Sequence, residues 1–129
     1  MTIKCGLLVR LEAKPGKEQA VADFLAAGVE MTNREAGTPI WFALKLSPTT
    51  FGVFDAFASE EDRQAHLGGN MAKSLMSRVD EMLAKPPSVE PVDILATKNQ
   101  LASFAPGETG REFSLHQPWL AITGHRPAP

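Results

Sequence analysis

Apolar and polar positions alternate along residues 3–13, the period expected of a β-strand with one apolar face. A Pro-Gly turn at residues 14–16 ends this strand. From Lys17 the apolar positions recur at helical spacing, and Gly37, with a proline two residues later, predicts the end of that helix. A strand followed by an amphipathic helix is therefore expected at the start of the chain.

Two further apolar segments, 40–46 and 50–57, are separated by a short Ser-Pro-Thr loop and predict an antiparallel hairpin. Both faces of this hairpin are apolar, and Val53 is assigned to the outward face. A small antiparallel sheet normally leaves one face in water, so a second covering layer is needed. Helices can cover one face, and a second copy of the sheet is the economical cover for the other. The pattern therefore predicts a homodimer.

Ser59 precedes three acidic residues and predicts the N-terminus of a helix that continues to Lys85, before two prolines. A final strand is expected at 89–96, and its proline marks an edge strand or a strand beginning. The order strand, helix, strand, strand, helix, strand is that of a ferredoxin-like α+β fold, βαββαβ, with a four-stranded antiparallel sheet. Residues 1–98 are predicted to form this domain, and 99–129 an irregular C-terminal extension.

The composition is that of one globular domain. The chain has 129 residues, 43% of them hydrophobic and 22% charged, with a net charge of −2. No basic stripe indicates nucleic acid, and no apolar run is long enough for a membrane span or is followed by a signal-cleavage site, so a cytoplasmic location is expected. Nucleotide-binding and common hydrolase motifs are absent, and His116 and His125 lack the spacing of metal ligands, so no metal site is expected.

Three stretches carry a resemblance to a known family. They are LLVRLEAKPGKEQAVADFL in the first strand and helix, FGVFDAFASEEDRQAHL in the hairpin and second helix, and VDILATK in the last strand. In this order and at this spacing the chain resembles the antibiotic biosynthesis monooxygenase-like family of dimeric α+β barrels. The resemblance covers about residues 3–98, three quarters of the chain.

The resemblance implies a homodimer of facing sheets, with a small-molecule pocket between each sheet and its own helices. Relatives include oxygenases that act on polyphenols, quinols or anthrones without metal or flavin, so no cofactor is expected, and relatives that degrade haem. The family often has an aromatic residue and an acid before the second helix and a histidine within it, and Phe54, Asp55, Phe57 and His66 stand at comparable places. The asparagine, tryptophan and histidine of the haem-degrading branch have no clear counterparts, which disfavours haem.

Within this resemblance, His66 is the candidate base, because a neutral imidazole can remove a proton from a phenol or quinol at cell pH. Asn70, one helical turn later, could hold a carbonyl or a developing oxyanion. Both residues also have structural interpretations. His66 fits the polar edge of a buried helix, and Asn70 fits an N-cap after the two preceding glycines.

An aromatic slot and an anion-binding group complete the candidate site. The four aromatic candidates for binding the substrate are Trp41, Phe42, Phe51 and Phe54. Arg63 could bind a substrate anion. For each aromatic residue the pattern favours a place in the core or in a dimer interface over a substrate slot, and Arg63 also fits a solvated helix surface. The leading hypothesis is a cofactor-independent monooxygenase of aromatic polyphenols or quinols, and the alternatives are a non-catalytic dimeric module that binds a small hydrophobic ligand and, less favoured, a haem-binding protein.

Overall fold

The computed structural model describes residues 2–98, and the chain divides into a compact unit at 1–96 and a second unit at 97–129. All helices and strands of the described residues belong to the first unit. The predicted irregular extension at 99–129 lies outside the described residues.

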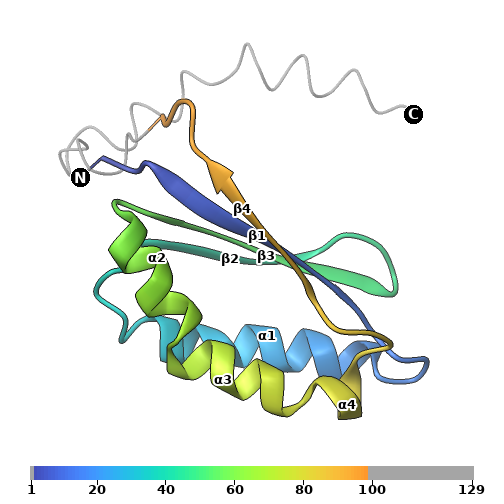
Figure 1. Ribbon diagram of the computed structural model, residues 1–129. Helices are drawn as coiled ribbons and strands as arrows, with labels where there is room; N and C mark the ends of the chain where they lie inside the picture. The colour runs from blue at the N-terminus through green and yellow to red at the C-terminus, as the bar shows by residue number, and fades with distance from the viewer. Residues whose placement is uncertain (1, 99–129) are drawn as a thin grey trace, which may run out of the picture. The chain divides into compact units, whose positions relative to one another are not determined.

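The first unit has the predicted alternation of strands and helices (Figure 1). The fold is α+β with βαββαβ order, which confirms the ferredoxin-like prediction. The elements are β1 (Cys5–Glu12), α1 (Glu18–Thr32), β2 (Ile40–Lys45), β3 (Thr50–Phe57), α2 (Glu60–Leu67), α3 (Asn70–Ser77), α4 (Val79–Met82) and β4 (Ser88–Asp93).

The four strands form one antiparallel sheet in the order β2-β3-β1-β4. Phe54 of β3 pairs with Phe42 of β2 on one side and with Leu8 of β1 on the other. Pro91 lies in β4, which is an edge strand. Proline has no backbone N–H to donate, and an edge strand tolerates this because it has a neighbouring strand on one side only.

The segment predicted as one helix from Ser59 to Lys85 is three helices, and the single-helix prediction is wrong. Ser59 caps α2 as expected, since its Oγ accepts from the backbone N–H of Asp62 at 3.1 Å. The helix ends at Gly68, and Gly69 has an extended backbone and precedes α3. Two consecutive glycines therefore break the helix, because glycine carries the largest backbone entropy cost within one.

The two faces of the sheet have different surroundings. In Figure 1 the helices lie together on one side of the sheet, and within residues 2–98 no helix covers the other side. The helix-covered face is the core, with buried apolar residues from β1 and β3: Cys5, Leu7, Val9, Leu11, Phe51, Val53 and Phe57. Val53 is 6% exposed and pairs with Val9, so its assignment to the outward face is wrong.

No helix among residues 2–98 is long and apolar enough to cross a membrane.

Candidate active site

The imidazole of His66 lies between two carboxylates. Its Nδ1 is 2.6 Å from Oε1 of Glu35, and its Nε2 is 3.0 Å from Oδ2 of Asp55. A carboxylate can only accept hydrogen bonds, so both ring nitrogens are placed to donate. This geometry favours the imidazolium ion, in which both nitrogens carry a proton.

Each of the three residues is positioned by a different element. Asp55 lies on β3 at the helix-covered face, between two buried apolar positions of the same face. His66 lies in the last turn of α2. Glu35 follows α1 in a turn, where its N–H donates to the carbonyl of Thr32 and its Oε1 accepts from the Thr38 hydroxyl at 3.0 Å.

The cluster is largely withdrawn from water. The side chains of His66, Asp55 and Glu35 are 8%, 1% and 19% exposed. Burial alone opposes a charge on the ring, but the hydrogen bonds and the charges of Asp55 and Glu35 outweigh it, and together they raise the pKa of His66 above its ordinary value. The structure therefore differs from the expected neutral imidazole base, because neither ring nitrogen has a free lone pair.

This raised pKa predicts how stability depends on pH. The folded state holds the His66 proton more tightly than the unfolded state, so the contribution of His66 to stability is fully present below the ordinary pKa of 6.5. It is lost as the pH rises through the folded-state pKa. The free energy of unfolding in urea should therefore fall from pH 6 towards alkaline pH, more steeply than in His66→Gln. Parallel pH profiles for the two proteins would contradict this expectation.

His66 contributes to the walls of two separate hollows. One is an apolar cavity of about 150 Å³ between the sheet and the helices, which Asp55 and Trp41 also line. The other is a more polar cleft of about 330 Å³, lined by Glu35, Asn70 and other residues of the α1–β2 turn and of α2. His66 thus separates an apolar cavity on its Asp55 side from a polar cleft on its Glu35 side.

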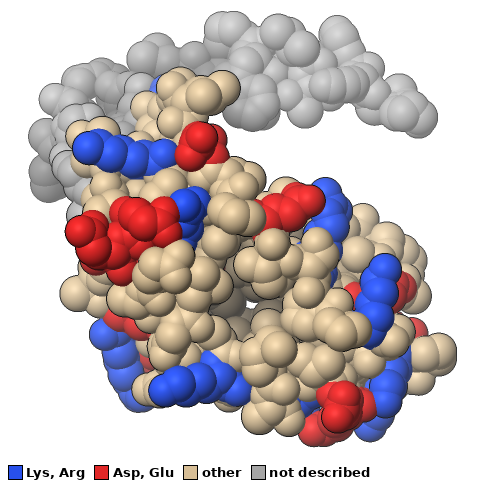
Figure 2. Space-filling model, viewed as in Figure 1, with Lys and Arg blue, Asp and Glu red and all other residues tan. Residues whose placement is uncertain are grey.

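The apolar cavity reaches the surface near the sheet edge. Its walls include Met76 of α3 and Val89 of β4, which are 60% and 47% exposed. Figure 2 shows a hollow in this face, in the region between the helices and β4, with uncharged residues immediately around it. The cavity therefore extends from the exposed residues Met76 and Val89 to Asp55.

Two buried carboxylate oxygens have no hydrogen-bond partner among the described residues, Oδ1 of Asp55 and Oε2 of Glu35. Each belongs to a carboxylate whose other oxygen contacts His66. A buried acceptor without a donor is costly, and such groups mark sites where a ligand or water supplies the missing partner. Asp55 is one of the residues that line the apolar cavity, and its Oδ1 is the buried oxygen without a donor.

The structure brings some of the predicted site residues together. Trp41 lines the apolar cavity with His66, and Asn70 lines the polar cleft. Asn70 is the first residue of α3 and Gly69 is its N-cap, so the N-cap interpretation of Asn70 is wrong. Phe51 is buried in the core beside α1 and does not line the cavity. The functional roles of Trp41 and Asn70 stay predictions.

Phe42 and Phe54 lie on the opposite face of the sheet from His66. They pair across β2 and β3, whereas the next positions, Trp41 and Asp55, form a pair on the helix-covered face. Phe42 is 56% exposed. The predicted four-residue aromatic slot does not form within one subunit, because alternate residues of a strand point to opposite faces.

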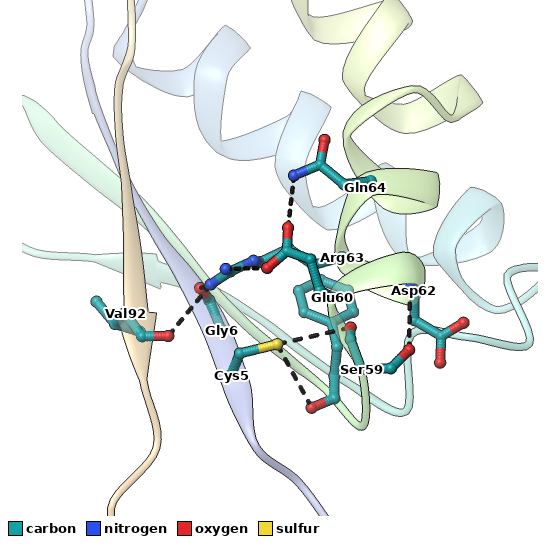
Figure 3. A network of polar contacts seen from close by, with 9 residues as sticks. Cys5, Gly6, Ser59, Glu60, Asp62, Arg63, Gln64 and Val92 are labelled. Atoms are coloured by element: carbon teal, nitrogen blue, oxygen red, sulfur yellow. Dashed lines mark hydrogen bonds and ion pairs between the residues drawn. The ribbon is translucent and has the colours of Figure 1, made fainter.

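Arg63 connects α2 to the sheet edge (Figure 3). Its guanidinium donates to the carbonyl of Gly6 at 3.0 Å and of Val92 at 3.3 Å, and it pairs with Glu60. It lines neither the cavity nor the cleft. These contacts make Arg63 a link between α2, β1 and β4, and its role in binding a substrate anion stays a prediction.

Sequence reasoning missed Glu35 as a site residue and gave Asp55 no role. Asp55 had a detectable signal, since it is an acid at an inward position between Val53 and Phe57. Glu35 had none, because nothing in one sequence pairs a turn residue with a histidine 31 positions later. Within residues 2–98, no group of three or more His, Cys, Asp and Glu side chains could hold a metal ion.

A scan against protein-family models and a search of curated proteins give no match. Solved structures do match. The chain is 56% identical to the NE2512 protein of Nitrosomonas europaea, a protein of unknown function, with a TM-score of 0.74 over 74% of this chain and 93% of that one.

Two other solved structures share the fold at lower identity. A provisionally named antibiotic biosynthesis monooxygenase from Nitrosomonas europaea is 20% identical, with a TM-score of 0.66 over 74% of this chain and 94% of that one. The Rv0793 protein of Mycobacterium tuberculosis is 18% identical, with a TM-score of 0.66 over 74% and 99%.

The sheet order and the helix-covered pocket define an α+β protein with the antibiotic biosynthesis monooxygenase fold. The chain belongs to the same family as the NE2512 protein, and it shares its fold with proteins that are provisionally named antibiotic biosynthesis monooxygenases. This family includes proteins of unknown function, so membership fixes the fold and leaves the reaction to be inferred from the site.

Proposed function

We propose that this protein is a cofactor-independent monooxygenase of an electron-rich phenol or quinol. The observation that carries the proposal is the buried Asp55–His66 ion pair in the wall of an apolar cavity, with one oxygen of Asp55 unpartnered. A perturbed acid–base pair beside an apolar pocket is the arrangement expected of a proton-transfer site.

In the first step Asp55 acts as the base. Its Oδ1 accepts the proton of the substrate hydroxyl, which leaves a phenolate in the cavity. The imidazolium of His66, 3.0 Å from the other oxygen of Asp55, is the nearby positive charge that stabilises this anion. The apolar cavity walls strengthen the attraction between the imidazolium and the phenolate, because charges interact more strongly where water is excluded.

In the second step the phenolate gives one electron to dioxygen, and the resulting radical and superoxide combine. The peroxide takes the proton back from Asp55, and the resulting hydroperoxide loses water at a ring carbon that carried a hydrogen. A phenol with a free para hydrogen then gives a quinone, and a hydroquinone with a free ortho hydrogen gives a hydroxyquinone. In both cases one substrate molecule and one O₂ give one product molecule and one H₂O. The electrons come from the substrate, and O₂ is the only oxidant. The protein supplies the base, the positive charge and an apolar site that protects the anion from water.

The size of the cavity favours a substrate with one aromatic ring. An engineered apolar cavity of about 150 Å³ in another protein holds a benzene molecule, and the cavity beside Asp55 has about this volume. Trp41 offers an aromatic surface on its wall. We therefore expect single-ring quinols and phenols to be better substrates than anthrones.

The test is oxygen uptake by purified protein with hydroquinones, naphthols and anthrones, after subtraction of spontaneous oxidation. Saturable uptake that is fastest with single-ring substrates supports the proposal. Saturable binding of the same compounds without uptake would favour the alternative, a module that binds a small hydrophobic ligand in the same cavity. A cytoplasmic location is part of the proposal and is tested by fractionation of the cell.

We also propose that the chain forms a homodimer through the uncovered face of the sheet. Leu8, Phe42 and Phe54 align across three strands of this face, and Phe42 is 56% exposed. Such an apolar patch is costly in water and is relieved by a self-complementary contact.

Phe42→Asp is expected to convert a dimer to a monomer, because an unpaired charge within the apolar interface is costly. Sedimentation equilibrium at micromolar concentration measures the mass. Val29→Asp is the matched control, since Val29 is 39% exposed on α1, away from this face. A wild-type protein that sediments as a monomer would overturn the dimer proposal.

A further inference from the structure

We propose that Glu35 is a positioning residue that keeps the His66 ring positively charged while Asp55 takes the substrate proton. The proposal rests on the function proposed above and assigns a role to a residue outside the substrate cavity. Glu35 is not among the residues that line the cavity, and it contacts the imidazole of His66, through which it acts.

The reason is the change in charge during the first step. Before the reaction the imidazolium lies between two carboxylates. Once Asp55 has accepted a proton it is neutral and no longer balances the ring. Among residues 2–98, Glu35, at 2.6 Å from Nδ1, is then the one charged carboxylate in contact with the ring. Without Glu35 the ring could lose its Nδ1 proton, and the phenolate would lose its nearby positive charge.

The local structure holds Glu35 against the ring. The Thr38 hydroxyl donates to Oε1 of Glu35 at 3.0 Å and lies 3.4 Å from Nδ1 of His66. On the other side, a Cβ at position 69 would be 2.9 Å from Oε2 of Glu35, so Gly69 leaves room for the carboxylate. Thr38 and Gly69 therefore fix the distance between Glu35 and the ring, and the second of the two glycines has a function besides breaking the helix.

The other charged groups near the ring do not replace Glu35. Facing His66 are Glu35 from the α1–β2 turn and Asp55 from β3. Arg34 and Asp62 also line the polar cleft, but neither forms a hydrogen bond or ion pair with His66. Asp62 therefore offers a matched control, since its substitution removes one negative charge from the same cleft without breaking a contact to the ring.

The experiment has a first part that needs no substrate. The titration of His66 is followed by NMR in wild type, Glu35→Gln and Asp62→Asn. We expect the midpoint to move to lower pH in Glu35→Gln and to stay near wild type in Asp62→Asn, because only Glu35 holds a proton on Nδ1. Gly69→Ala is expected to move it in the same direction by displacing Glu35 without removing its charge. An unchanged midpoint in Glu35→Gln would overturn the proposal, whatever the oxygen assay gives.

The second part is kinetic. Glu35→Gln should lower kcat for the best quinol by about tenfold, the effect of losing one charged hydrogen bond, with KM little changed, and the alkaline limb of the pH profile should move to lower pH. Glu35→Asp should recover part of the activity. If the alkaline limb of the pH profile is the same in Glu35→Gln as in wild type, Glu35 has no role in the reaction. If the His66 titration moves in Glu35→Gln but the wild-type protein oxidises no quinol, the proposed function is overturned. The effect of Glu35 on the charge of His66 would still hold.

Discussion

Asp55→Asn is expected to lower kcat/KM for quinol-dependent oxygen uptake by about 100-fold or more, the range for loss of a general base. Asparagine has nearly the same shape as aspartate, and its carbonyl oxygen can still accept a hydrogen bond from Nε2 of His66, so the cavity should keep its form. The amide cannot take a proton from a substrate hydroxyl. Initial rates in an oxygen electrode measure the loss.

The control for this variant is Asp93→Asn, because Asp93 is an exposed residue on β4 with no contact to the site. It should retain wild-type rates. Ligand affinity, measured with a quinol under nitrogen, should change little in Asp55→Asn. If Asp55→Asn kept most of the wild-type rate, Asp55 would not be the base, and the mechanism proposed above would be wrong.

The second large effect is on stability. His66→Ala should lower the free energy of unfolding by about 3–5 kcal/mol, the cost of removing one partner from a buried ion pair. The variant leaves Asp55, 1% exposed, and Glu35 without a positive charge between them. Because whole domains are stable by only about 5–15 kcal/mol, this variant is close to unfolding. Urea denaturation at pH 7 measures the change.

A double variant separates this charge effect from lost packing. In Asp55→Asn/His66→Ala the most buried carboxylate is gone, so the loss should be smaller than the sum of the two single losses. Two results would contradict this account: stability losses of the two single variants that are strictly additive in the double variant, or a loss of stability below about 1 kcal/mol in His66→Ala. Either would show that His66 does not neutralise the buried charge of Asp55. For the same reason His66→Ala is a poor activity control, and His66→Gln is preferable.

The period-two patterns predicted the strands, because alternate side chains of a strand point to opposite faces of the sheet and one face is buried. Residues 3–13 and 50–57 became β1 and β3, the two central strands, and the residues predicted to share a face do so. The assignment of Val53 to the outward face is wrong. That error arose because an isolated hairpin with two apolar faces does not show which face the helices cover. The packing of Val53 and its partner Val9 in one buried cluster with residues of α1 and α3 decides it.

The candidate site was predicted less completely than the fold. His66 was found because the family resemblance places a histidine in this helix, and Asp55 stands at the place of the acid that the family often has before it. Glu35 could not be found, because its role depends on a turn that brings residue 35 within 2.6 Å of residue 66. The sequence therefore suggested a neutral base, whereas the two carboxylate contacts raise the pKa of His66 and favour an imidazolium.

The prediction of a four-residue aromatic slot is wrong because of strand geometry. Trp41 and Phe42 are neighbours in sequence and point to opposite faces, so no single pocket on one face can include both. The apolar residues of the uncovered face are instead available for the proposed dimer contact, and those of the covered face line the cavity beside Asp55.

The most direct test of the central claim is oxygenation under ¹⁸O₂ of a single-ring phenol or quinol by wild-type protein treated with chelator, with His66→Gln and Asp55→Asn beside it. We predict one labelled oxygen atom in each product molecule, the other in water, and label incorporation that is strongly reduced in both variants. Product without label, or equal incorporation in folded Asp55→Asn, would contradict the account of Asp55 and His66 as an oxygenase site.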